Sequence, residues 1–112
     1  MASHPAAARP PAHCRDMTEV RTEIDRIDRM LVDGIAERFG YVERAWQLKL
    51  VAKQEANVPW RNQQVIDKVR ARGSAKGVPA DLCEALWRQM IGWFVQYEEE
   101  KLRISLEGKG GG

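Results

Sequence analysis

The chain has 112 residues, of which 44% are hydrophobic and 30% charged, a length and composition that favour one small soluble domain. Its 18 Lys and Arg nearly balance its 16 Asp and Glu, and a net charge of +2 gives no electrostatic indication of a nucleic-acid partner. No apolar run approaches the roughly 18 residues that span a membrane, and the N-terminus has no secretory signal, so we expect a cytoplasmic protein without a membrane partner.

Residues 1–15, rich in Ala and Pro, are predicted to form a flexible leader. The leader holds both histidines, His4 and His13, so the remaining chain has no imidazole for a metal site or a general base. The two cysteines, Cys14 and Cys83, lie in no metal-binding or redox motif, and we expect reduced thiols. The sequence therefore predicts no metal site.

The first helix is predicted from about Asp16 to Lys53. Asp16 and Glu19 have the spacing of a capping box. The motif NVP at 57–59 ends the helical pattern, because a residue before proline avoids helical angles. Between these signals, apolar residues recur at helical spacing, namely Val20, Ile24, Ile27, Leu31, Ile35, Val42 and Ala45.

Two further helices are predicted after the proline. The second covers about 59–72 and is closed by Gly73 and the loop GSAKGV. The third covers about 79–105, with Asp81 and Glu84 as a second capping pair. No convincing strand pattern is present, so the predicted fold class is all-α, with three helices per chain and one long N-terminal helix.

These helices form one predicted domain over residues 16–107, followed by a flexible tail, GKGGG, at 108–112. The first helix, about 37 residues at 1.5 Å each, extends roughly 55 Å. A compact domain of this size is only about 35 Å across, judged from its expected radius of gyration. The rest of the chain cannot cover such a long apolar stripe, so we predict an obligate oligomer, most simply a two-fold homodimer.

Two cations interrupt that apolar stripe. With Val20 at zero degrees and about 100° per residue, Arg38 falls at about 0° and Lys49 at about 20°, while Arg21 lies at the edge near 100°. A buried cation without a partner costs several kcal/mol, and the same strip of the helix carries no carboxylate. Arg38 and Lys49 therefore either pair with carboxylates from elsewhere or bind an anionic ligand, to which Arg61 could contribute.

The third helix contains a carboxylate at the end of an apolar line. Trp87, Ile91 and Phe94 share one helical face, and Glu98 follows Phe94 at the next position on that face. Glu98 is therefore either part of the buried site or the solvated end of the line, like its neighbour Glu99.

Three segments of the chain resemble the all-helical chorismate mutases, including the related isochorismate pyruvate lyases. They are VRTEIDRIDRMLVDGIAERFGYVERAWQLK, PWRNQQVIDKV and LWRQMIGWFVQYEEEK, and the resemblance covers about residues 16–105. The pattern of this family has an Arg, a second Arg 17 residues later, a Lys 11 residues after that and an Arg 12 residues further on. Arg21, Arg38, Lys49 and Arg61 reproduce this specific spacing. The resemblance implies an interlocked homodimer of three-helix chains, with two equivalent sites that are each built from both chains.

The resemblance also implies roles for individual residues toward a small dianionic substrate. Arg38 and the partner's Arg21 bind its two carboxylates, and Arg61 closes over the site. Lys49 and Glu98 face the ether oxygen, although many relatives carry Gln at the position of Glu98.

Two positions depart from the pattern of this family. Asn62 stands where some mutases carry a glutamate that binds the substrate hydroxyl. Val58 stands where some mutases carry an aspartate. We count Asn62 among the substrate-binding residues, but the group that contacts the hydroxyl stays open.

The implied activity is chorismate mutase, the rearrangement of chorismate to prephenate in aromatic amino acid biosynthesis. This unimolecular reaction requires no cofactor, metal or nucleophile. The site holds the reactive conformer and stabilises charge on the ether oxygen, with Arg38, Lys49 and Glu98 as catalytic residues.

Two alternatives stay open at the level of the sequence. The same cationic pocket would serve an isochorismate pyruvate lyase or a mutase of an amino-substituted chorismate. In a non-catalytic helical dimerisation or regulatory module, Arg38 and Lys49 would instead pair with carboxylates across the dimer.

Overall fold

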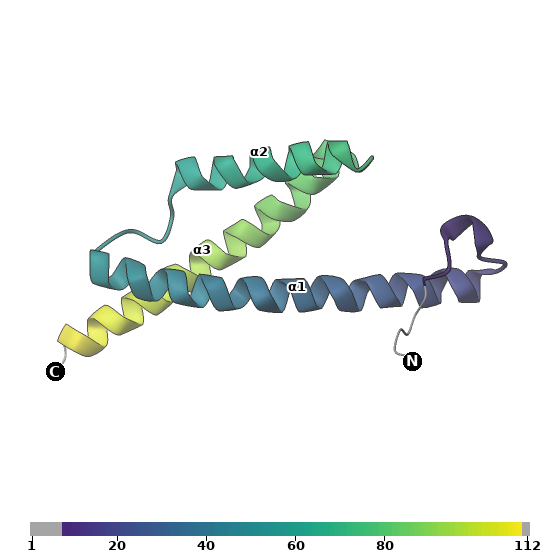
Figure 1. The fold of residues 1–112 in the computed structure, drawn as a ribbon. Helices are drawn as coiled ribbons and strands as arrows, with labels where there is room; N and C mark the ends of the chain where they lie inside the picture. Colours follow the sequence, from purple (N-terminus) through teal and green to yellow (C-terminus); the bar gives the residue numbers. More distant parts are fainter. Residues whose placement is uncertain (1–7, 111–112) are drawn as a thin grey trace. The chain divides into compact units, whose positions relative to one another are not determined.

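The computed structural model describes residues 8–110 (Figure 1). Over this range the chain is all-α, with a 3-10 turn η1, Pro11–His13, and the helices α1, Met17–Ala52, α2, Pro59–Ala75, and α3, Ala80–Gly110. The predicted fold class and the three predicted helices are confirmed. No helix within 8–110 is long and apolar enough to cross a membrane.

The third helix is longer than predicted, because it continues through residues 108–110 of the predicted tail. Residues 111–112 of that tail and residues 1–7 of the predicted leader lie outside the described residues. The chain forms two compact units, Met1–Gly40 and Tyr41–Gly112, and α1 contributes to both.

In the unit Met1–Gly40, the start of α1 is capped largely as predicted. The backbone N–H of Glu19 donates to Asp16 Oδ1 at 2.9 Å. The Glu19 carboxylate does not make the reciprocal bond of a capping box, since it accepts the backbone N–H of Arg15 at 2.7 Å instead. The Arg15 guanidinium lies 2.7 Å from the same carboxylate, and Arg9 lies 3.7 Å from it.

These contacts give an expected pH dependence at the start of α1. The hydrogen bonds that Arg15 donates hold the pKa of Glu19 below its usual range. A lowered carboxyl pKa stabilises the folded state above the usual pKa, and this contribution is lost as the pH falls through the lowered value. We expect the Arg15 amide proton resonance to titrate with a midpoint below that of an ordinary glutamate, and Glu19→Gln to abolish the titration. A midpoint at the ordinary value would contradict the assignment.

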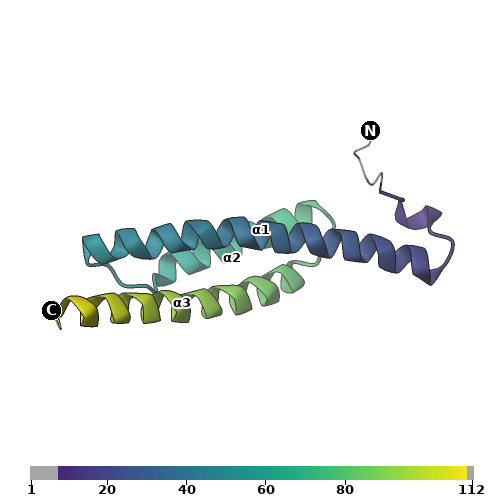
Figure 2. The same cartoon turned by 90° about the horizontal axis from the view of Figure 1, so that it is seen from below.

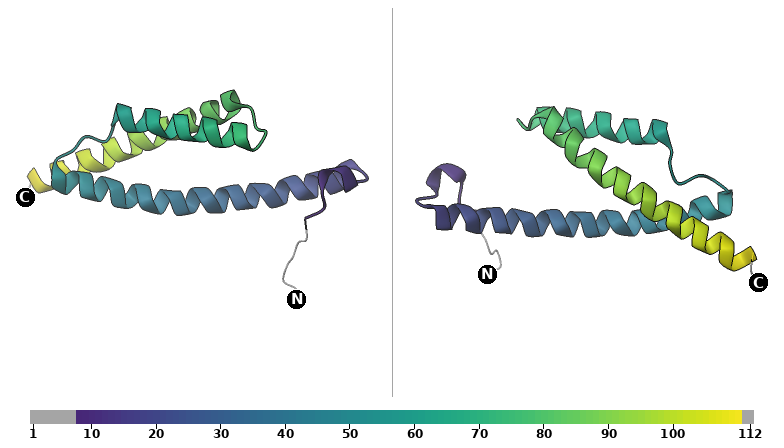
Figure 3. Two further views of the ribbon diagram at one scale, coloured as in Figure 1. Left: turned by 45° about the horizontal axis from the view of Figure 1, so that its top comes forward. Right: turned by 180° about the vertical axis from the view of Figure 1, so that it is seen from behind.

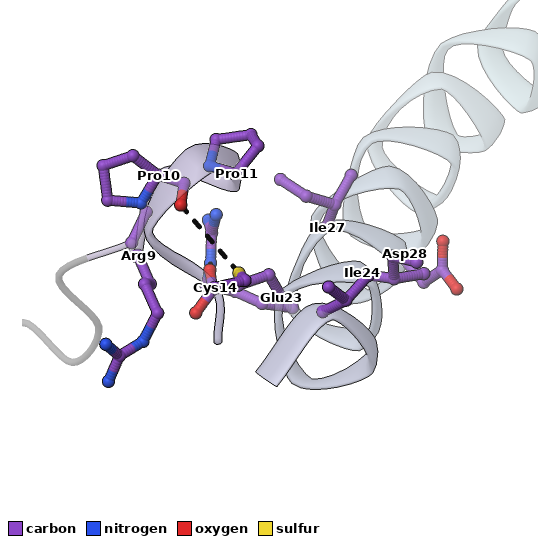
Figure 4. A pocket seen from close by; sticks show the side chains of 11 residues that line it. Arg9, Pro10, Pro11, Cys14, Glu23, Ile24, Ile27 and Asp28 are labelled. Carbon is purple, nitrogen blue, oxygen red and sulfur yellow. Dashed lines mark hydrogen bonds and ion pairs between the residues drawn. The ribbon is translucent and has the colours of Figure 1, made fainter. Parts of the chain in front are cut away.

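The segment before α1 encloses a pocket of ≈ 490 Å³ against the first turns of that helix (Figure 4). Pro10, Pro11, Ile24 and Ile27 are among the residues that line it. The Cys14 thiol donates to the Pro10 carbonyl at 3.9 Å, a distance typical of a weak sulfur hydrogen bond. Most of the residues that line this pocket are apolar.

In the unit Tyr41–Gly112, α2 and α3 run in opposite directions and pack against each other, and α3 then passes the C-terminal end of α1 (Figure 2, Figure 3). Ile66 of α2 is 1% exposed and Phe94 of α3 is 6% exposed, so these side chains form the centre of the packing. The Trp93 ring meets Phe94 edge-on and stacks on Tyr97.

The predicted capping pair at the start of α3 is wrong. The helix begins one residue before Asp81, and the N–H of Leu82 donates to the Pro79 carbonyl at 3.1 Å. Asp81 and Glu84 bind Arg70 of α2 instead, at 3.2 and 2.7 Å. A capping pattern in the sequence cannot anticipate a competing cation from another helix.

The predicted role of Gly73 as the end of α2 is also wrong. The helix continues to Ala75, and Gly77, at φ 78°, supplies the left-handed residue that ends it. Gly73 lies buried inside α2, where an added Cβ would come within 2.4 Å of Cys83 Sγ. The absence of a side chain at Gly73 leaves room for Cys83 of α3 at this point of the packing.

We therefore expect Gly73→Ala to destabilise the protein by about 1–3 kcal/mol, since the new methyl group overfills a packed contact. Urea unfolding would measure the loss. Cys83→Ala removes the obstructing sulfur, so in the Gly73→Ala background it should recover part of the stability. Gly92→Ala is the matched control, because a Cβ there meets nothing within 4 Å. Equal effects of the two glycine substitutions would refute the packing argument.

Candidate functional site

Lys49 and Glu98 come from different helices and meet in the unit Tyr41–Gly112. Lys49 Nζ lies 3.0 Å from Glu98 Oε1 and also donates to the Ala56 carbonyl at 2.9 Å. Glu98 is 7% exposed, and the Lys49 side chain is 19% exposed. The site therefore contains a largely desolvated ion pair with an additional backbone acceptor.

The end of α1 explains how a backbone carbonyl reaches Lys49. Lys53 adopts a left-handed conformation at φ 57°, and the N–H of Gln54 donates to the Lys49 carbonyl at 2.9 Å. This turn reverses the chain, and Ala56, 6% exposed, follows within a few residues. The Lys49 side chain thus holds the connection between α1 and α2.

The face of α3 explains the position of Glu98. Phe94, one turn earlier on that face, is buried, whereas Glu99 and Glu100 are exposed. The hypothesis that Glu98 belongs to the buried line is confirmed, and the alternative of a solvated end is wrong. The strip of α1 around Lys49 lacks a carboxylate, as the sequence indicated, but α3 supplies one. Lys49 is therefore paired within its own chain.

Arg61 and Asn62 lie in the first turn of α2, after Pro59. Arg61 is exposed, and its guanidinium donates to Gln64 Oε1 at 2.7 Å. Asn62 is half-buried, and its amide nitrogen donates to Asn57 Oδ1 at 2.8 Å. The two residues therefore share a helical turn but differ in burial and in their partners.

Asn62 and Asn57 line a pocket of ≈ 380 Å³. Its other lining residues are Ile66, Arg88, Ile91, Gly92, Val95, Gln96 and Glu99. The pocket lies between the α1–α2 connection, α2 and α3, and it combines apolar side chains with amide and charged groups.

The two remaining predicted site residues, Arg21 and Arg38, belong to the unit Met1–Gly40. Arg21 is exposed and Arg38 is half-buried. Neither arginine lines the ≈ 490 Å³ pocket of that unit, whose lining includes no predicted site residue. In the unit Tyr41–Gly112, the structure brings two predicted site residues, Lys49 and Glu98, into direct contact.

Sequence reasoning missed several groups around this pair. The Ala56 carbonyl has no side-chain signature, and the sequence presents Asn57 only as part of the helix-ending NVP motif. Tyr97 donates a hydrogen bond to Glu43, which also accepts the Trp46 indole N–H at 3.3 Å. The bond to the Glu43 carboxylate raises the pKa of Tyr97. These groups join α1 to α3 next to Glu98.

Comparisons with known proteins give the family. A sequence model of the family Chorismate mutase type II matches residues 20–99, a range that includes every predicted site residue. The isochorismate pyruvate lyase of Pseudomonas aeruginosa is 27% identical over 85 residues, which cover 76% of this chain and 83% of that protein. The T-protein of Enterobacter agglomerans is 30% identical over 76 residues, which cover 68% of this chain and 20% of that protein. Because the family match covers more than half of this chain, the chain belongs to the chorismate mutase type II family.

Proposed function

We propose that the protein is a chorismate mutase, which rearranges chorismate to prephenate in aromatic amino acid biosynthesis. The observation that carries this proposal is the contact between Lys49 and Glu98, at 3.0 Å, inside the range that matches the family. A cation and a carboxyl group that are held together and largely shielded from water suit a reaction that needs positioned charge rather than a nucleophile.

The geometry of Lys49 supports a role at the ether oxygen of the substrate. An ammonium group has three donors. Glu98 and the Ala56 carbonyl accept two hydrogen bonds from it, which leaves one donor for the substrate. Because both acceptors belong to the folded chain, the ammonium is oriented before the substrate binds, and little reorganisation is needed as negative charge develops.

The arginines would bind the two carboxylates, since a guanidinium forms two parallel hydrogen bonds to a carboxylate. In this proposal Arg38 and the partner's Arg21 bind the substrate and Arg61 closes over it. The role of Arg21 requires a homodimer. Supporting a dimer, α1 contains no buried residue along its whole length, and Ile24, Leu31 and Ile35 are about half exposed.

The test is to incubate the purified protein separately with chorismate and with isochorismate and to identify the products. Prephenate from chorismate is the expected result. Salicylate and pyruvate from isochorismate, without prephenate from chorismate, would overturn the proposal.

A lyase is the second candidate, because the relative from Pseudomonas aeruginosa that covers 76% of this chain is an isochorismate pyruvate lyase. The glutamate at position 98, where the resemblance leads us to expect glutamine in a lyase, favours the mutase. A mutase of an amino-substituted chorismate would use the same charged groups. For a non-catalytic module we would expect neither product nor a thermal shift with anionic ligands.

A further inference from the structure

A second polar contact joins α1 to α3 beside the contact between Lys49 and Glu98. The Tyr97 hydroxyl donates to Glu43 Oε1, and the two residues are 54 positions apart in the chain. Both side chains are half-buried. All four residues lie in the unit Tyr41–Gly112, so the two contacts can be described together.

The carboxylate of Glu43 is held on its own helix where it meets Tyr97. The Trp46 indole N–H donates to the same oxygen, Glu43 Oε1, at 3.3 Å. Trp46 follows Glu43 by three residues, a spacing at which side chains are neighbours on the surface of a helix. The acceptor for the Tyr97 hydroxyl therefore has a defined place on α1.

The ring of Tyr97 is held from two sides by residues of α3. Trp93, one turn earlier, stacks on it with ring centroids 5.5 Å apart and an interplanar angle of 12°. The Lys101 ammonium, one turn later, lies 5.4 Å from the ring centroid, a cation–π distance. Both contacts involve the ring and not the hydroxyl, so Tyr97→Phe would keep them and remove only the hydrogen bond to Glu43.

The two contacts together define how α3 is rotated about its own axis. Tyr97 and Glu98 are consecutive residues, so their side chains point about 100° apart around α3. Their partners on α1, Glu43 and Lys49, are six residues apart, about 9 Å along that helix. Apolar packing of α3 on α2 is non-directional, whereas two hydrogen bonds in different directions oppose rotation of the helix.

The rotation of α3 bears on the reaction because Glu98 orients the Lys49 ammonium. We infer that Glu43 and Tyr97 are positioning residues: their hydrogen bond fixes the rotation of α3 and, through Glu98, keeps Lys49 directed at the ether oxygen of the substrate. This inference rests on the proposed function. Because the pair acts through Lys49 and does not contact the substrate, its loss lowers kcat and leaves KM unchanged.

The test measures kcat and KM for chorismate in variants of this pair. In Tyr97→Phe we expect kcat to fall ~10-fold, the scale of one hydrogen bond, with KM within about twofold of wild type. Glu43→Ala should lower kcat by the same factor, and the double variant should lose no more, since both substitutions remove the same bond. Glu43→Gln keeps an acceptor for the hydroxyl, so its kcat should stay within about twofold of wild type.

Two further variants separate positioning from a general structural role. In Lys49→Ala, adding Tyr97→Phe should not lower the residual turnover, because the group that the bond orients is absent. Tyr41→Phe is the matched control, since it removes the hydroxyl of a tyrosine of α1 that is 71% exposed, and it should have wild-type kcat.

The inference is overturned by a folded Tyr97→Phe protein with wild-type kcat, or by one in which only KM rises. A further ~10-fold loss from Tyr97→Phe in the Lys49→Ala background would show a merely structural role and would also overturn it. These results leave the proposed function standing as long as the wild-type protein forms prephenate. Wild-type protein that forms no prephenate would overturn the proposed function, and this inference with it.

Discussion

Lys49→Ala is expected to lower the turnover of chorismate at least ~100-fold, the scale of losing one preorganised donor in an enclosed site. The Ala56 carbonyl and Glu98 hold the Lys49 ammonium at 2.9 and 3.0 Å. The ammonium is therefore fixed relative to α3 and to the connection between α1 and α2. Steady-state kinetics would show the loss in kcat, because the donor acts on charge that develops in the transition state.

The matched control is Lys53→Ala, which removes an exposed lysine one turn later on the same segment. It should leave kcat unchanged, which separates the position of Lys49 from a general loss of positive charge. Lys49→Ala also leaves Glu98 buried without its cation, at a cost of several kcal/mol. Unfolding curves should therefore accompany the kinetics. A folded Lys49→Ala protein with wild-type turnover would refute the assignment.

Arg38→Ala should reduce turnover by a similar factor, at least ~100-fold, if its guanidinium binds a substrate carboxylate. Arg44→Ala, an exposed arginine of the same helix, is the control and should be active. Wild-type activity of Arg38→Ala would remove this residue from the proposed site.

Glu98→Gln is expected to retain or raise the turnover of chorismate. An ionised carboxylate beside the ether oxygen would repel the developing negative charge, whereas the uncharged amide of glutamine can donate a hydrogen bond to it. The side-chain oxygen of glutamine also still accepts a hydrogen bond from Lys49.

Steady-state measurements of kcat would test this. Glu100→Gln is the control, since Glu100 is exposed and forms its ion pair with Arg103 of the same helix. Its kcat should match the wild type. A folded Glu98→Gln protein that has lost its turnover would contradict the expected role of a neutral donor at this position.

Much of the fold followed from local patterns. Helix α1 begins beside Asp16, whose side chain caps it, and α2 begins at Pro59, whose fixed φ suits the first helical position. These signals act over one or two turns, so they can be read without knowing the rest of the chain. The predictions for the end of α2 and for the cap of α3 were wrong for a different reason. Gly73 packs against Cys83 of α3, and Asp81 pairs with Arg70 of α2, so both residues make contacts with another helix.

The candidate site was predictable to a lesser degree. Helical spacing identified Lys49 as a cation on an apolar face and Glu98 as the end of an apolar line. It could not pair them, because the contact joins residues that are 49 positions apart and depends on how α3 passes the end of α1. Periodicity defines the face of one helix, but it does not define the neighbour of that face.

The sequence by itself determined an all-α chain of three helices and the presence of charged side chains on faces that should be apolar, because helical periodicity is a local property. The tertiary structure alone decided that Glu98 is the partner of Lys49, that the Ala56 carbonyl orients the ammonium and that Asn57 holds Asn62. Those contacts depend on the turn at Lys53 and on the packing of α3, which bring together groups that no sequence spacing relates.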